Sequence, residues 1–189
     1  MAYASCLILG DLYRGAEKIM TVETLFLDYA VEKLEQLMSR IEICLGMLTE
    51  EQIWFRRHGN ENAIGNLLLH LSGNVQQWIV SSLGDQPDHR DRNSEFDTQG
   101  GLAAVELAAR LRKTLERAVS TVSGLTPERL ARTYEIQTYR VSGVEAVFHV
   151  VEHFSYHTGQ IIFATKSFTG RDLGFYKHLK NAESTEQVP

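Results

Sequence analysis

The sequence is poor in cysteine and proline, with two and three residues of these types among 189. Cys6 and Cys44 lie far apart in the chain and form no CxxC pair. Such sparse use of cysteine indicates a reduced, intracellular protein, and we expect it in the cytoplasm. Cys44 has apolar neighbours, so we interpret it as a small core residue.

Long apolar runs and an excess of positive charge are also missing. No stretch approaches the ~18 consecutive apolar residues that a membrane span needs, and the apolar run at 2–10 lacks the basic region of a signal peptide. The formal charge is −5, and no long Lys/Arg run is present. We therefore expect neither a membrane nor a nucleic acid as the partner. The 43% hydrophobic content is typical of one globular domain.

Four segments carry the periodic apolar pattern of amphipathic helices. In the first segment, for example, apolar residues recur in alternating steps of four and three from Leu27 to Leu48. Four long amphipathic helices in one domain predict an all-α four-helix bundle. The expected helices span about 22–48, 62–83, 102–123 and 142–169.

Capping residues support these boundaries. Thr21 is a predicted N-cap for the first helix, and Ser142 with Glu145 forms a capping box for the fourth. We expect the bundle to span 20–180. Residues 1–19 would be a dispensable N-terminal extension that starts from an upstream codon, and 181–189 would be a polar tail.

Two connections stand out between the helices. Asp85–Gly101 is long and rich in turn residues, which predicts a crossover loop between the second and third helices. Its charged residues favour a solvated cluster over a substrate clamp, although Arg90 and Arg92 are candidates for binding a carboxylate through their guanidinium groups. The charged and polar cluster of the crossover loop comprises Asp88, His89, Arg90, Asp91, Arg92 and Glu95. The second connection, Thr133–Arg140, is predicted to be an extended connector.

Three histidines recur at intervals of four in the fourth helix. His149, His153 and His157 are each one helical turn apart, so their imidazoles share one face. Random placement of seven histidines gives only about 0.01 such triples. Neighbours on such a face have Cβ atoms roughly 5–6 Å apart, so two imidazole nitrogens can converge on one metal ion.

A facing helix offers a further ligand. His70 lies in the apolar run 67–71 of the second helix, with Asn66 and Asn74 one turn away on either side. A lone histidine on an apolar face is more often a core residue than a ligand. Bundle helices pack about 8–10 Å apart, however, so His70 can complete a site begun by a histidine pair on the fourth helix.

The segments NLLLHLSGN at 66–74 and HVVEHFSYHTGQ at 149–160 resemble the DinB/YfiT-like superfamily. The resemblance covers roughly residues 21–179 and includes RDRNSEF at 90–96 and LGFYKHL at 173–179. It implies a four-helix bundle with one histidine on the second helix and an HxxxH pair followed by Gly-Gln on the fourth. His70, His153 and His157 would then be the metal ligands. Some members of the superfamily are similar to metal-dependent thiol S-transferases or isomerases, and the resemblance also implies a homodimer that pairs through exposed helix faces.

Several polar residues near this set are open to more than one interpretation. His149 would be a fourth ligand, a pocket or ligand-supporting group, or a residue of the helix surface. Gln160 and Asn74 are weak catalytic candidates that could orient a bound water or thiol, and Tyr156 either lines a pocket or packs. His149–His153 also matches the HxxEH protease pattern, which we reject because only 36 residues follow and Glu152 points about 100° away.

Two functions follow from a three-histidine site. Three neutral imidazoles do not compensate the charge of a divalent ion, and they leave at least one of its coordination positions open. This is the pattern of a catalytic site. We expect zinc or nickel first, although imidazole also suits iron and copper. The first hypothesis is a thiol S-transferase or small hydrolase that activates a low-molecular-weight thiol or a water against a small-molecule substrate. The alternative is a non-catalytic, stress-associated bundle in which the metal is structural.

Overall fold

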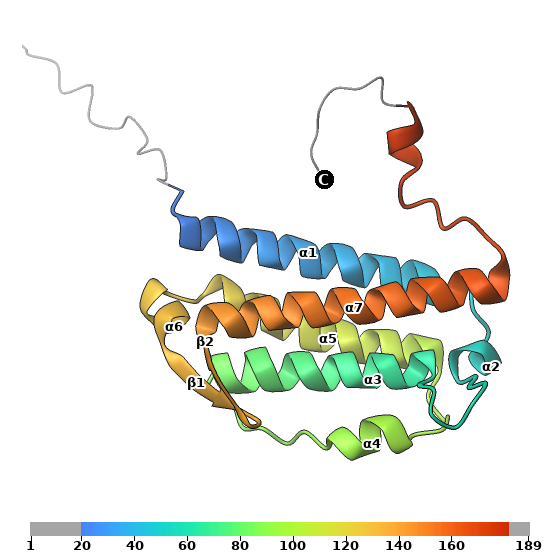
Figure 1. Cartoon of the computed structure of the whole chain (residues 1–189), viewed down its shortest axis with the longest axis horizontal. Helices are drawn as coiled ribbons and strands as arrows, with labels where there is room; N and C mark the ends of the chain where they lie inside the picture. The colour runs from blue at the N-terminus through green and yellow to red at the C-terminus, as the bar shows by residue number, and fades with distance from the viewer. Residues whose placement is uncertain (1–19, 182–189) are drawn as a thin grey trace, which may run out of the picture.

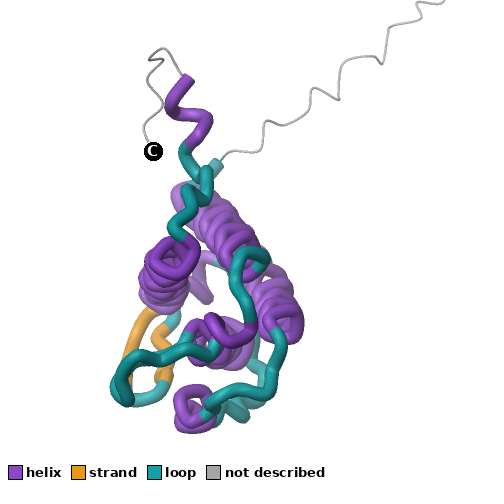
Figure 2. Tube along the Cα trace, turned by 90° about the vertical axis from the view of Figure 1, so that its right-hand side faces the viewer, coloured by secondary structure: helices purple, strands orange, loops and turns teal. Residues whose placement is uncertain are grey.

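Four long helices lie side by side in the computed structural model, which describes residues 20–181 (Figures 1 and 2). They are α1 (Val22–Leu45), α3 (Ile64–Val75), α5 (Ala104–Ser123) and α7 (Gly143–Thr169). Helices α1 and α3 each pack against both α5 and α7, so the four helices enclose one core. The prediction of an all-α four-helix bundle is confirmed.

The predicted caps form at the helix starts. The Thr21 side chain accepts a hydrogen bond from the backbone of Thr24, and Ser142 and Glu145 bond reciprocally as a capping box. Short helices α2 (Glu50–Ile53) and α6 (Pro127–Ala131) join the long ones. The extension at 1–19 and nearly all of the tail at 181–189 lie outside the described residues.

Apolar stripes from all four helices meet in the interior. The spacing seen in the sequence explains this core, because residues three or four apart on each helix point inward together. Cys44 is buried among them as expected, and Trp78 is also buried. The fully enclosed side chains include Leu34, Met38, Ile41, Leu68, Leu71, Leu111, Leu115 and Phe154.

The second predicted helix, 62–83, changes type midway. It is α-helical only to Val75, and η1 (Gln76–Leu83) continues it as a π-helix. In this segment the backbone N–H of Gly84 donates to the carbonyl of Ile79, five residues earlier. The apolar pattern did not predict this change. Apolar spacing shows which residues share a helix face, but not whether the backbone hydrogen bonds span four residues or five.

The segment predicted as a structureless loop, Asp85–Gly101, contains a helix. Helix α4 (Arg92–Asp97) begins at Asp91, whose side chain accepts from the backbone of its first turn, and it packs against α3. Asn66 of α3 donates from its amide to the carbonyl of Thr98 at 2.7 Å. The prediction of a loop missed this element because short helices carry little periodicity.

The expected extended connector at Thr133–Arg140 is a hairpin. Strands β1 (Thr133–Ile136) and β2 (Tyr139–Ser142) pair antiparallel, with Ile136 opposite Tyr139. Strand β1 packs against η1, so the hairpin closes one end of the bundle (Figure 1). Beyond α7 the described chain ends in the 3₁₀ helix η2 (Lys177–Asn181). Within residues 20–181, no helix combines the length and apolarity that crossing a membrane requires.

Candidate metal centre

Three histidine rings from two helices converge in the bundle. Nε2 of His153 lies 3.0 Å from Nε2 of His70 and 3.2 Å from Nε2 of His157. One ligand atom from each ring lies within 4.8 Å of the other two. His70 is buried in α3, while the two rings of α7 are partly buried. The structure therefore brings together the three histidines that the spacing and the resemblance selected, which we call the triad.

Glu95 of α4 forms a hydrogen bond with Nδ1 of His70, the ring nitrogen that does not face the other two histidines. Its Oε2 lies 2.9 Å from Nδ1 of His70, and its side chain is buried. Burial raises the pKa of this carboxyl, but hydrogen bonds from Arg90 and His70 and their charges outweigh burial, so the pKa is lowered. An ionised carboxylate only accepts hydrogen bonds. Nδ1 of His70 therefore carries the proton and leaves the Nε2 lone pair facing the other two rings.

Arg90 completes this buried arrangement. Its Nε and Nη2 donate to the two oxygens of Glu95 at 2.7 and 2.9 Å, and its side chain is 3% exposed. Nη2 also lies 3.2 Å from Nδ1 of His70, but that contact is longer than the one between His70 and Glu95. The interpretation of Arg90 and Glu95 as members of a solvated cluster is thus wrong.

Gly73 makes the approach of Glu95 possible. It lies three residues after His70 on α3, and a Cβ at this position would overlap the Glu95 carboxylate and come within 2.9 Å of Nε of Arg90. A glycine inside an apolar helix costs roughly 1 kcal/mol relative to alanine, so it usually marks a close approach. This glycine was the one sequence signal for the buried carboxylate.

Gln160 holds the ring of His157. The amide Oε1 of Gln160 lies 2.7 Å from Nδ1 of His157, so Nδ1 donates and Nε2 again keeps a free lone pair. Both residues lie on α7, three positions apart, where side chains of one helix face meet. Gln160 therefore contacts a triad ring directly.

The surroundings disfavour protonation of His153 and His157, the two triad histidines of α7. Burial, followed by the charges of His157 and His70, lowers the pKa of His153 to about 3. Burial also lowers the pKa of His157, although its hydrogen bond to Gln160 opposes this. Both imidazoles are therefore neutral at pH 7 and have lone pairs available for a ligand bond.

The donor set fits a divalent cation. Bonds of 2.0–2.1 Å in tetrahedral geometry separate neighbouring nitrogens by about 3.3 Å. The two distances from Nε2 of His153, 3.0 Å to His70 and 3.2 Å to His157, are close to this value. Two of the three rings are oriented through Nδ1 by a carboxylate or an amide, as is common for metal-bound histidines. Nδ1 of His153 is buried and lacks a hydrogen-bond partner among residues 20–181. Without an ion, one proton on Nε2 of His153 can lie between the two neighbouring lone pairs.

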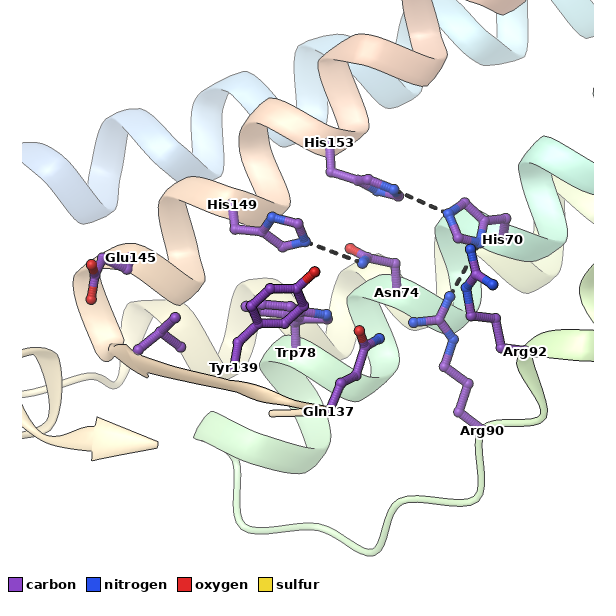
Figure 3. A pocket seen from close by; sticks show the side chains of 11 residues that line it. His70, Asn74, Trp78, Arg90, Arg92, Gln137, Tyr139, Glu145, His149 and His153 are labelled. Atoms are coloured by element: carbon purple, nitrogen blue, oxygen red, sulfur yellow. Dashed lines mark hydrogen bonds between the residues drawn. The ribbon is translucent and has the colours of Figure 1, made fainter. Parts of the chain in front are cut away.

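A cavity of about 420 Å³ opens beside the triad (Figure 3). His70 and His153 form one side of it, and residues of η1 and of the β-hairpin form the other. This volume is within the range of small-molecule sites. The remaining lining residues are Asn74, Trp78, Arg90, Arg92, Gln137, Tyr139, Val141, Glu145 and His149.

His149 belongs to the cavity and not to the triad cluster. Its ring stacks on Trp78 with the centroids 3.9 Å apart, and its Nε2 lies 3.5 Å from the amide nitrogen of Asn74 (Figure 3). Burial is the main cause that lowers the pKa of His149. Of the three interpretations from sequence, the pocket group agrees with this position.

Other residues singled out in the sequence lie farther from the ligand atoms. Tyr156 is exposed, and its ring meets the ring of His157 edge-on at 5.2 Å. His58, His178 and Glu152 are exposed.

Comparisons with known proteins agree with this fold. A family described as proteins of unknown function, DUF1572, matches residues 21–180, and the chain belongs to this family. No curated protein matches it. The DinB-like fold that the resemblance implied is confirmed, because structural neighbours described as DinB-like proteins share it.

Three solved structures share the fold. A conserved protein from Enterococcus faecalis is 16% identical with a TM-score of 0.65, over 80% of this chain and 99% of its own. A DinB-like protein from Bacillus cereus is 17% identical with a TM-score of 0.61, over 78% and 93%. A DinB-like protein from Bacillus subtilis is 16% identical with a TM-score of 0.59, over 78% and 97%. At such low identity these likenesses show the fold alone.

Proposed function

We propose that the protein is a metal-dependent enzyme, a thiol S-transferase or small hydrolase, that uses a divalent ion held by His70, His153 and His157. The observation that carries this proposal is the convergence of three Nε2 atoms, at 3.0 and 3.2 Å, from two different helices. A bound ion would supply Lewis-acid activation of a water or a low-molecular-weight thiol at its open position. Zinc and nickel are the ions that we would test first.

The residues around the triad would fix the ligand geometry. Glu95 and Gln160 each accept from an Nδ1, so the Nε2 lone pairs of His70 and His157 are set before any ion binds. Arg90 keeps the Glu95 carboxylate ionised by donating to both of its oxygens. This preorganisation supports tight binding, because little side-chain freedom is lost when the ion enters.

The cavity supports a catalytic site over a purely structural one. Structural metal sites are closed by protein ligands, whereas the cavity beside His70 and His153 offers room for a substrate. His149 lines this cavity and presents a neutral imidazole at pH 7, because burial lowers its pKa. It is placed to accept a proton from a bound thiol or water, and Asn74 lies next to its ring.

Chelation tests the proposal. We expect zinc- or nickel-loaded protein to turn over thiol-transfer or ester substrates, metal-stripped protein to be inactive, and added metal to restore activity. His149→Asn should keep its metal and lose most of its activity. If stripping instead lowers stability by several kcal/mol while no thiol or ester substrate turns over in the loaded protein, the structural alternative is correct.

A further inference from the structure

Two arginines line the cavity beside the triad, and the structure gives them different tasks. Arg90 is almost fully buried, with Nε and Nη2 on Glu95 and Nη1 on Gln77 at 3.0 Å. Its charge is therefore compensated, and its donors are used within the protein. It is poorly suited to bind a ligand.

Arg92 has the opposite character. Its side chain is exposed, and within the described part of the chain no acidic group lies at ion-pair distance. The guanidinium lies over the ring of Phe96 at 5.0 Å, and that ring in turn packs on His70 at 4.8 Å. These contacts place the cation beside the triad, and Figure 3 shows Arg92 next to His70.

The charges of the cavity favour an anion. Among its lining residues the one acidic side chain is Glu145, whose Oε2 accepts from the backbone and hydroxyl of Ser142 at 2.6 and 2.8 Å. That carboxylate is occupied in the cap of α7. Near the triad, the cavity therefore has a guanidinium without an ion-pair partner, and a bound divalent ion would add further positive charge.

The opposite wall is aromatic. The ring centroid of Trp78 lies 3.9 Å from that of His149 and 6.1 Å from that of Tyr139. Such a wall favours a flat or apolar group, which can stack on the rings. The cavity thus combines a cation at the triad with an apolar surface across from it.

We propose that this cavity binds a small molecule that carries a carboxylate, with Arg92 as its binding residue. The apolar body of the molecule lies along Trp78 and Tyr139, and its reactive group lies at the triad. This inference names the substrate class and rests on the proposed function. Guanidinium binds carboxylates through two parallel hydrogen bonds, so lysine at position 92 would be a poor replacement.

A titration of the cobalt-loaded full chain tests the proposal. The probes are 3-mercaptopropionate and 2-mercaptoethanol, thiols with and without a carboxylate, followed through the sulfur-to-cobalt absorption band. We expect the carboxylate thiol to bind about tenfold more tightly, the gain typical of a hydrogen bond between charged groups. Arg92→Gln should abolish this preference, and Arg92→Lys should reduce it. Arg140→Gln, at an exposed arginine of β2 outside the cavity, should leave it unchanged.

A second titration uses the metal-free full chain, because a metal ion can itself hold a carboxylate. Its probes are 3-phenylpropionate and the neutral 3-phenylpropionamide, followed by calorimetry. The acid should bind more tightly than the amide in the wild type and equally in Arg92→Gln. Equal binding in the wild type, or a preference that Arg92→Gln retains, would overturn the proposal. Failure of the chain to take up cobalt would refute the proposed function instead, and the metal-free titration would still decide the role of Arg92.

Discussion

His149 and His157 have the same spacing from His153 on α7, yet they lie in different environments. The ring of His157 is fixed through Nδ1 by Gln160 and faces His70 across the bundle. The ring of His149 stacks on Trp78, and its polar contact to Asn74 is long, at 3.5 Å. The residue on the facing helix therefore decides the role of each histidine. Where it is His70 the rings form a ligand cluster, and where it is Trp78 they form a cavity wall.

This difference separates metal binding from ligand binding. Changes around the triad should reduce metal affinity, whereas changes around His149 should leave metal affinity intact and affect binding and turnover in the cavity.

Glu95→Ala should have the largest effect. It removes the acceptor for Nδ1 of His70 and leaves the nearly buried charge of Arg90 without its partner. We expect metal affinity to fall 10–100-fold, as for other supporting carboxylates. Unfolding free energy should fall by about 3–5 kcal/mol, because an unpaired buried charge is costly. Metal titration and urea denaturation measure the two effects.

Asp97→Ala is the control for this variant, since Asp97 is an exposed residue of the same helix. It should change neither quantity. Wild-type metal affinity in Glu95→Ala would show that the buried carboxylate does not support the triad.

Gly73→Ala should have the next largest effect. The added Cβ would overlap the Glu95 carboxylate, which has to move away from His70. We expect a loss of about 1–3 kcal/mol in stability, as for other overpacked sites, together with weaker metal binding. Thermal denaturation with and without metal measures both.

Gly159→Ala provides the matched glycine of α7. A Cβ there meets no atom within 4 Å, so alanine should stabilise the helix by roughly 0.5–1 kcal/mol. If the two alanine variants behaved alike, the close approach at Gly73 would not matter.

Acid should destabilise the metal-free protein below pH 6.5. The pKa of His153 is about 3 in the folded state because of burial and the neighbouring histidines, and near 6.5 when unfolded. Below pH 6.5 the unfolded chain binds a proton that the folded chain does not, so the free energy of unfolding decreases as the pH is lowered. This residue should account for at most about 2 kcal/mol between pH 6.5 and 5. Urea denaturation in the presence of a chelator measures the slope.

His153→Gln should flatten this slope, and His58→Gln, at an exposed histidine, should leave it as in the wild type. A slope that His153→Gln does not alter would show that the titration belongs to another group.

Gln160→Ala should have the smallest effect. Its hydrogen bond to His157 is exposed to solvent, and such a bond contributes about 1 kcal/mol, which corresponds to about fivefold in metal affinity. Competition with a chromophoric chelator can resolve this change. Ser155→Ala, at another exposed position of α7, should bind metal like the wild type.

The bundle could be predicted from the sequence because it rests on local periodicity, whereas the choice of His153 and His157 over His149 came from the resemblance. The histidines at 153 and 157 share a helix face by spacing alone, and the polar stripe around His70 marked the facing helix. Capping residues fixed the helix starts for the same reason, since their partners are three residues away.

The support of the triad could not be predicted in this way. Glu95 lies 25 residues from His70, and the charged residues around it are typical of solvated loops. Only the packing of α4 against α3 shows that Glu95 and Arg90 are buried. The π-helical turn of η1 was missed because apolar spacing does not report the hydrogen-bond step. Gly73 was the one position whose residue type indicated the close approach.

Elemental analysis of the purified protein beside His153→Ala and His149→Ala tests the central claim most directly. The wild type and His149→Ala should each contain about one divalent metal ion per chain, and His153→Ala should contain almost none, with all three variants folded by circular dichroism. Equal metal content in His153→Ala and the wild type, or a wild type that takes up no zinc or nickel when these are supplied, would contradict the account.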